Sequence, residues 1–250
     1  MPSLMIRGRL IYFAHCPKAG GTSVERFMVE RWGASVGMLG WGWDRKWARE
    51  GERAGEVPSS PQHLVWEDAR HVLPRAPDHV FAIVRDPVAR MVSEYRYQIE
   101  ERLTGPIGRP IRHLGFSTWL RLMLAMADRN PYTHDNHFRP QTAFLPDGDV
   151  TVFHLEDGLK PALDWLCARA GEAAPVDLPH LLKSKESRVG VPTSADKALI
   201  YDRFRVDYQR FGYSAPATKQ AGHAAVRRGG SSVTGFAAGV FERFYRRGLV

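Results

Sequence analysis

The chain has 250 residues, enough to bury one sizeable hydrophobic core, so we expect a single main domain. Its 44% hydrophobic and 25% charged residues are typical of folded globular proteins and argue against the disordered and fibrous classes. Lysine and arginine, 35 in total, outnumber the 27 acidic residues, and the formal charge of +8 favours anionic partners.

The sequence lacks the signatures of several other protein classes. It contains no basic recognition helix, zinc-finger spacing or aromatic RNA-binding motif, so we expect no nucleic-acid partner. Its two cysteines, Cys16 and Cys167, form no metal-binding or disulfide pattern, and we expect no metal site. No apolar run is long enough to span a membrane, and the first residues lack a signal-peptide core. We therefore expect a cytoplasmic protein, and nothing in the sequence indicates its oligomeric state.

A strand, a glycine turn and a helix follow one another near the start of the chain. Residues 10–16 are apolar strand formers, residues 17–23 contain one lysine and two adjacent glycines, and residues 24–32 carry apolar side chains at helical spacing. This arrangement points backbone N–H groups and a helix N-terminus at one anion. We therefore predict a phosphate-binding loop. Its Lys18 precedes the glycines, whereas a nucleoside-triphosphatase P-loop has its lysine after them, followed by a magnesium-binding hydroxyl.

A second corner of the same kind is predicted further along the chain. Residues 33–62 have no sustained periodicity and are interpreted as a long loop insertion, after which a brief apolar run at 63–66 is a candidate strand. Residues 78–84 have the pattern of a buried strand that ends at Arg85. Asp86 and the following proline are typical of a helix N-cap and first position, so we expect a helix from there to about residue 103.

The second half of the chain alternates helices and strands again. We interpret the polar, aromatic and turn-rich segment 130–141 as part of a functional site. The other expected elements are a short helix at 67–73, a helix at 117–127, a strand at 149–155, and helices at 158–170 and 194–210. This alternation predicts one α/β domain with a central, mostly parallel sheet flanked by helices.

We place this domain in residues 1–216 and treat 217–250 as a basic C-terminal extension. The extension carries an amphipathic stretch at 236–245 between two arginine pairs. Such a stretch can contact an anionic membrane surface, cover a partner, or dock on its own domain, which is the commonest outcome.

Both corners resemble motifs of one enzyme family. The loop Pro17-Lys18-Ala19-Gly20-Gly21-Thr22-Ser23 closely resembles the PKxGGTS phosphosulfate loop of sulfotransferases that use 3′-phosphoadenosine 5′-phosphosulfate (PAPS), in particular the family that contains carbohydrate sulfotransferases. Residues 81–95, FAIVRDPVARMVSEY, resemble that family's 3′-phosphate motif. Looser similarity extends through residues 136–141, 182–185 and 201–213. The resemblance implies the P-loop-kinase-like fold of sulfotransferases.

The resemblance also implies a reaction and a donor site. It implies transfer of a sulfuryl group from PAPS to a hydroxyl, less readily an amine, of a carbohydrate-like acceptor, with no required metal. Residues 17–23 would bind the donor's phosphosulfate, and Arg85 and Ser93 its 3′-phosphate. Lys183, Ser184 and Lys185 are further donor ligands, unless they form only a solvated basic surface. Negative charge grows on the leaving phosphate in this reaction, and Lys18 with the helix N-terminus is suited to stabilise it.

The acceptor hydroxyl requires a general base, and the sequence offers several candidates. His63 is the first, because a neutral imidazole accepts protons near pH 7 and related carbohydrate sulfotransferases carry a catalytic histidine at this place. The alternative is a histidine that simply bonds a backbone group. His137 is the second candidate, and Glu67 or Glu94 a more distant third. We also predict that His137, Arg139 and Gln141 contact the acceptor.

Two other functions remain open at the level of the sequence. A nucleotide-dependent kinase would use a related fold, but it needs a lysine after the glycines and a magnesium-binding acid, which we do not find. A non-catalytic nucleotide- or glycan-binding protein would keep the phosphate loop and lack the base. Incubating the protein with PAPS and candidate saccharides separates an enzyme, which adds a sulfo group, from a binder.

Overall fold

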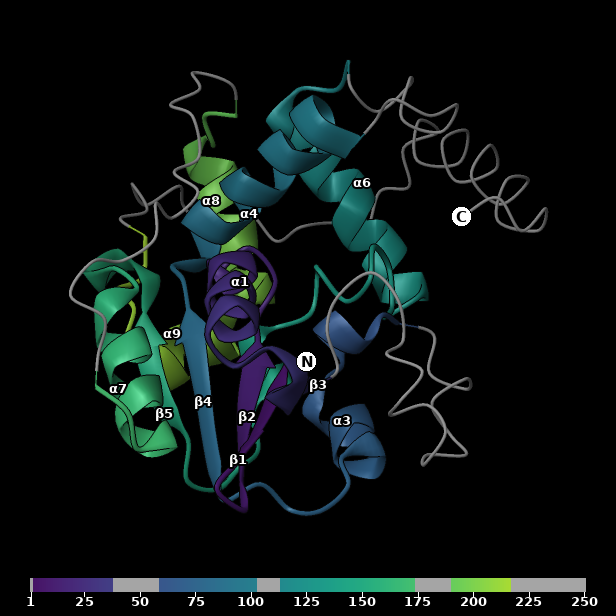
Figure 1. Cartoon of the computed structure of the whole chain (residues 1–250). Coiled ribbons are helices and arrows are strands. Elements are labelled where there is room, and N and C mark those ends of the chain that lie inside the picture. Colours follow the sequence, from purple (N-terminus) through teal and green to yellow (C-terminus); the bar gives the residue numbers. More distant parts are fainter. Residues whose placement is uncertain (1, 38–58, 103–112, 174–189, 217–250) are drawn as a thin grey trace. The chain divides into compact units, whose positions relative to one another are not determined.

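A five-stranded mixed sheet forms the centre of the structure, with the strand order β3-β1-β2-β4-β5 (Figure 1). The computed structural model describes residues 2–37, 59–102, 113–173 and 190–216, all of which belong to one unit, Met1–Pro216. The strands are β1 (Ser3–Ile6), β2 (Arg9–His15), β3 (Val36–Gly37), β4 (His79–Val84) and β5 (Thr151–His154).

Seven α-helices flank the sheet in the described part of the chain. They are α1 (Gly21–Trp32), α3 (Trp66–Val72), α4 (Pro87–Arg96), α6 (Phe116–Arg129), α7 (Lys160–Ala170), α8 (Ser194–Arg203) and α9 (Arg205–Phe211). Short 3₁₀ turns lie at Gly33–Ser35, Pro61–His63, Gln141–Phe144 and Leu155–Asp157, and a π-helical turn at Tyr97–Arg102 extends α4. None of the helices among the described residues is both long and apolar enough to cross a bilayer. The predicted α/β fold with a helix-flanked sheet is therefore confirmed.

The sheet is parallel only in one half. β2 pairs with β4, and β4 with β5, in parallel, whereas β1 pairs with both β2 and β3 in the antiparallel sense. Neither β1 nor β3 was predicted from the sequence. β1 joins β2 through the two-residue turn Arg7-Gly8, and both residues have positive φ, as hairpin turns of this length require.

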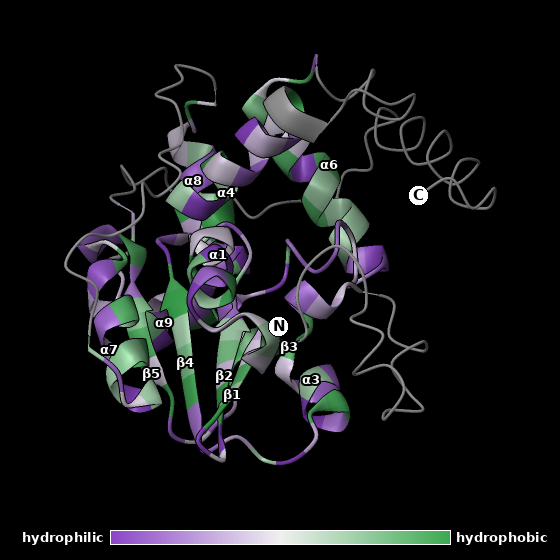
Figure 2. Cartoon of the chain, in the orientation of Figure 1, coloured by the Kyte–Doolittle hydropathy of each residue, from purple (hydrophilic) through white to green (hydrophobic). Residues whose placement is uncertain are grey.

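Alternate residues of the central strands pack on opposite faces of the sheet. On one face Ile11 and Phe13 of β2 contact a cluster that includes residues of α1 and α7. On the other face Tyr12 and Ala14 contact residues of α3 and α9. After His79, β4 is hydrophobic to its end (Figure 2). A strand buried on both faces is read in the sequence as a continuous apolar run, which explains why residues 10–16 and 78–84 were the clearest signals.

Two expectations about local structure were wrong. The apolar run at 63–66 forms no strand, because Pro61 starts a 3₁₀ turn that ends at His63, and α3 begins at Trp66. The helix expected at 194–210 is divided at Phe204, whose φ of −112° and ψ of 25° are not helical. The helix expected from Pro87 to about residue 103 is confirmed, since α4 ends at Arg96 and continues as the π-helical turn to Arg102.

Candidate active site

The predicted phosphate loop connects the end of β2 to the start of α1. The loop turns sharply because Lys18 and Gly20 have left-handed backbone angles, with φ of 64° and 84°. A Cβ at Gly20 would lie 2.9 Å from Leu155 Cδ1, and a Cβ at Gly21 would lie 1.9 Å from the Nε2 atom of His15. Both positions therefore require glycine, the first for its conformation and the second for the space occupied by the histidine ring.

The N-terminus of α1 is suited to an anion. Its first turn contains no acidic residue, and no side chain caps it. The first amide groups of a helix lack intrahelical acceptors and carry a partial positive charge. Pro17 and Ala19 are buried, so these two residues would contact an anion through their backbone atoms only. Thr22 is exposed and Ser23 is partly exposed. The loop has the form of an anion-binding site.

Arg85, at the second corner, contacts the phosphate loop at the first. β2 and β4 are adjacent and parallel, so their carboxyl ends lie at the same edge of the sheet. There the Arg85 guanidinium donates a hydrogen bond of 3.3 Å to the Lys18 carbonyl oxygen. Asp86 accepts a hydrogen bond from the Ala89 amide at 2.8 Å, which confirms it as the N-cap of α4. Ser93 lies half-buried further along this helix.

Gln141 holds the strand end that carries Arg85. Its Oε1 atom accepts a hydrogen bond from the Arg85 amide, and its Nε2 donates to the Arg85 carbonyl, both at 2.9 Å. The Gln141 backbone amide in turn donates to the carboxylate of Asp207 on α9 at 2.8 Å. Gln141 is fully buried, and its two hydrogen bonds fix the backbone of Arg85. The predicted contact between Gln141 and an acceptor stays a prediction.

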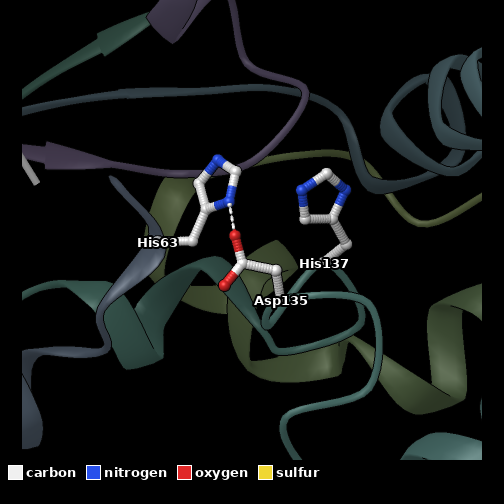
Figure 3. Close-up of side chains that lie close together, drawn as sticks. All are labelled: His63, Asp135 and His137. Carbon is white, nitrogen blue, oxygen red and sulfur yellow. Dashed lines mark hydrogen bonds and ion pairs between the residues drawn. The ribbon is translucent and has the colours of Figure 1, made fainter. Parts of the chain in front are cut away.

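His63 forms a close pair with Asp135. The Nδ1 atom of His63 lies 2.7 Å from Asp135 Oδ2, which leaves Nε2 on the far side of the ring (Figure 3). Asp135 also accepts hydrogen bonds from the Ser60 amide at 2.6 Å and the Ser60 hydroxyl at 2.5 Å. Asn136 donates to the His63 carbonyl at 2.8 Å. The residues around His63 therefore fix both its backbone and the orientation of its ring.

Burial determines the protonation state of His63. It lowers the pKa of His63 to about 3, although the hydrogen bond to Asp135 acts in the opposite direction. Burial raises the pKa of Asp135, but its hydrogen bonds to His63 and Ser60 outweigh burial and hold that pKa below the usual range. We therefore assign a neutral imidazole that donates from Nδ1 to a carboxylate. The Nε2 atom of that tautomer is a proton acceptor.

Two more histidine–carboxylate pairs lie beside the first. The Nδ1 atom of His137 lies 2.6 Å from Glu94 Oε2, and that of His15 lies 2.7 Å from Glu25 Oε1. The His63 ring is 4.7 Å from the His137 ring and 5.0 Å from the His15 ring, measured between centroids. His63 and His137, the two leading candidates for the general base, thus lie in one cluster.

Lys18 is connected to this histidine cluster through Tyr97. The Nζ atom of Lys18 lies 3.7 Å from the centroid of the Tyr97 ring. That ring is nearly parallel to the His137 ring, at a centroid distance of 6.4 Å. Burial raises the pKa of Glu94, but the charges of His137 and Lys18 and the hydrogen bonds from His137 and Gln98 outweigh it, and the pKa falls to about 2.

Comparison with known protein families agrees with this geometry. Residues 4–157 match the profile of the sulfotransferase family, and the match covers both corners and all three histidine–carboxylate pairs. The chain belongs to the sulfotransferase family. Searches of curated proteins and of solved structures found no match. Membership of this family supports sulfuryl transfer in general.

One group of side chains in the sulfotransferase domain also suits a metal ion. Among the described residues, His63, Asp135 and His137 each offer a ligand atom, and these atoms lie within 4.8 Å of one another (Figure 3). Two imidazoles and a carboxylate are ligands that Zn²⁺ accepts.

The remaining candidates lie in several places. Arg139 is half-buried with its guanidinium 5.5 Å from the Tyr132 ring, and its backbone carbonyl accepts a hydrogen bond from Arg90. Glu67 is exposed on α3 and pairs with Arg70. Glu94 is the buried partner of His137. The predicted donor ligands Lys183, Ser184 and Lys185, residues 38–58 of the insertion predicted at 33–62, and the extension from 217 to 250 lie outside the described residues.

Sequence reasoning missed the partners of the candidate residues. Asp135 was assigned no role, Tyr97 was interpreted as either a core or an acceptor-lining residue, and His15 as structural or exposed. Asp135 lies in the polar segment 130–141 that was marked as part of a site, and this was the only signal for it. His15 is buried next to the phosphate loop, and its position as the last residue of β2 was a signal that it lies at the functional edge of the sheet.

Proposed function

We propose that this protein transfers a sulfuryl group from PAPS to a hydroxyl group of a carbohydrate-like acceptor, less readily to an amine. One observation carries the proposal. The Lys18 loop, Arg85 and the His63–Asp135 pair, which are far apart in the sequence, meet at the carboxyl ends of β2 and β4. In sheets of this kind ligands bind at that edge.

Each group has a distinct task in the proposed reaction. The His63 Nε2 atom accepts the proton of the acceptor hydroxyl while that oxygen forms its bond to sulfur. The bond between sulfur and the bridging phosphate oxygen breaks, and the electron pair stays on the phosphate. Lys18 and the amide groups at the start of α1 stabilise this charge. Asp135 keeps the His63 proton on Nδ1 and stabilises the imidazolium that forms.

The donor's 3′-phosphate distinguishes PAPS from ATP and ADP. We assign its recognition to Arg85, because a guanidinium forms strong charge-assisted hydrogen bonds to phosphate. Burial lowers the pKa of Arg85, yet an arginine stays protonated at neutral pH. Ser93, eight residues further on, is the second proposed ligand. The net charge of +8 favours an acceptor that is itself acidic, such as an anionic polysaccharide.

Two measurements, made one after the other, test this function. Adenosine 3′,5′-bisphosphate (PAP), the product of the donor, should raise the melting temperature more than ADP does at equal concentration, because only PAP carries the 3′-phosphate. Equal shifts would count against PAPS as the donor. Transfer of label from ³⁵S-PAPS to a fractionated polysaccharide pool then identifies the acceptor class. Donor binding without transfer to any acceptor would instead indicate a nucleotide- or glycan-binding protein.

A further inference from the structure

The contact between Lys18 and Tyr97 lies between the phosphate loop and the histidine cluster. At 3.7 Å from Nζ to the ring centroid, it is well inside the range of about 6 Å in which a cation is attracted to an aromatic face. By comparison, the buried Arg90 guanidinium lies 4.8 Å from the Phe204 ring. The ammonium of Lys18 therefore lies over the face of the Tyr97 ring.

The backbone fixes both sides of this contact. Lys18 has a left-handed conformation, with φ of 64°, which sets the direction in which its side chain leaves the loop. Tyr97 is the first residue of the π-helical turn that follows α4. Such turns are rare and occur often at functional sites. The adjacent Gln98 is buried, donates to Glu94 at 2.6 Å and accepts from the Trp119 indole at 2.8 Å, which anchors the turn.

The chemistry of the contact suits a lysine that has to meet a phosphate. The face of an aromatic ring attracts the ammonium but has no carboxylate oxygens that would neutralise it. The nearby acid, Glu94, binds His137 with one oxygen and Gln98 with the other, and the charge of Lys18 helps to lower its pKa. A lysine side chain is flexible, and ordering it only when the donor binds would cost conformational entropy. A ring that orders the side chain beforehand reduces this cost.

We propose that Tyr97 is a positioning residue, whose ring holds the Lys18 ammonium at the phosphate loop in readiness for the leaving phosphate of the donor. This inference rests on the proposed function. It assigns to Tyr97 no contact with the reacting atoms. Because the ring face alone provides the effect, phenylalanine can replace the tyrosine, whereas leucine, which is apolar but has no π-system, cannot.

The test compares Tyr97→Phe with Tyr97→Leu in the full chain. We expect Tyr97→Phe to keep the PAP affinity and kcat/KM of the unmodified protein within about twofold. Tyr97→Leu should lower both by roughly 2- to 30-fold, the range expected for loss of one cation–π contact. Tyr201→Leu is a matched control, because Tyr201 is also half-buried and lies near a cation, Arg205, but on α8. This control should leave PAP affinity unchanged.

Two further measurements separate positioning from a general loss of structure. In NMR spectra the Cε protons of Lys18, assigned by their loss in Lys18→Met, should be shifted upfield by the ring in the unmodified protein and in Tyr97→Phe, and not in Tyr97→Leu. In a Lys18→Met background, Tyr97→Leu should cause no further loss of PAP affinity, because the two residues act as a unit.

The inference is overturned by any of three results. These are a Lys18 signal that is not shifted, a Tyr97→Phe variant as impaired as Tyr97→Leu, and an undiminished effect of Tyr97→Leu in the Lys18→Met background. A chain that binds PAP but transfers no sulfuryl group would refute the proposed reaction instead. In that case the PAP affinities of the variants still decide the role of Tyr97.

Discussion

Replacing Asp135 with asparagine tests the proposed general base most directly. The Ser60 amide, whose position is set by the backbone, donates to Asp135 Oδ1, while His63 Nδ1 lies against Oδ2. In Asp135→Asn the amide oxygen must stay at the first position to accept from Ser60, which turns the NH₂ group toward His63. That group can only donate, so the proton of His63 moves to Nε2 and the base is lost.

The magnitude follows from two effects. Loss of a hydrogen bond to a charged group costs about 1.5–3 kcal/mol, which corresponds to roughly 10- to 150-fold in rate. Locking a catalytic histidine in the wrong tautomer adds to this, and such changes in hydrolases reach about 10⁴-fold. We therefore expect Asp135→Asn to lower kcat by on the order of 10²-fold or more. Asp135→Ala, which leaves the tautomer free, should be impaired less or equally.

The assay is the initial rate of transfer from ³⁵S-PAPS, with PAP affinity measured by calorimetry as a control for folding and donor binding. Both variants should bind PAP normally, since Asp135 contacts His63 and Ser60 in the described structure. An Asp135→Asn protein within threefold of full activity would refute the reasoning. So would an asparagine variant clearly more active than the alanine variant, because tautomer locking would then not occur.

Three other predictions concern charge in the site. Lys18→Ala should reduce turnover by on the order of 10²-fold or more, since one charge-stabilising donor is lost, and near-full turnover in the transfer assay would contradict its role. Arg85→Gln should weaken PAP binding by roughly 10- to 100-fold in calorimetry while binding of AMP changes less, and equal losses would contradict recognition of the 3′-phosphate. The pKa of His63 is about 3 in the folded protein and near 6.5 in the unfolded chain, so below pH 6.5 only the unfolded chain binds a proton at this residue. The free energy of unfolding is therefore retained above pH 6.5 and falls as the pH is lowered toward 3. Between pH 7 and pH 5 urea denaturation should show a loss of about 2 kcal/mol from this residue, absent in His63→Gln, and an equal loss in that variant would refute the assignment.

The two corners were predictable because their signals are local. A lysine and two glycines after an apolar run, and an aspartate and a proline after another, specify strand-to-helix turns within a few residues. The parallel pairing of β2 with β4 then brings Lys18 and Arg85 together. The region that contains Lys18 and Arg85 could therefore be predicted from the sequence on physical grounds.

The partners of the histidines could not be predicted in this way. Asp135 is 72 residues from His63, and Glu94 is 43 residues from His137, in a loop and a helix with no shared periodicity. Which acid meets which imidazole depends on how the irregular segment 130–141 folds over the sheet edge. The same reason explains the missed strand β3, whose two residues are defined only by pairing with β1. The break at Phe204 was hidden because apolar spacing continues across it.

The loop that carries Asp135 places a limit on engineering this protein. His134, Asp135 and Asn136 are consecutive residues with positive φ, at 47°, 57° and 67°. Left-handed conformations cost free energy at any residue other than glycine, although asparagine and aspartate tolerate them best. Glycine at Asn136 would relieve this strain and would also remove the hydrogen bond to the His63 carbonyl. A search for heat-resistant variants would thus favour the substitutions that loosen the proposed base, and thermostability and turnover should trade against each other at these three positions.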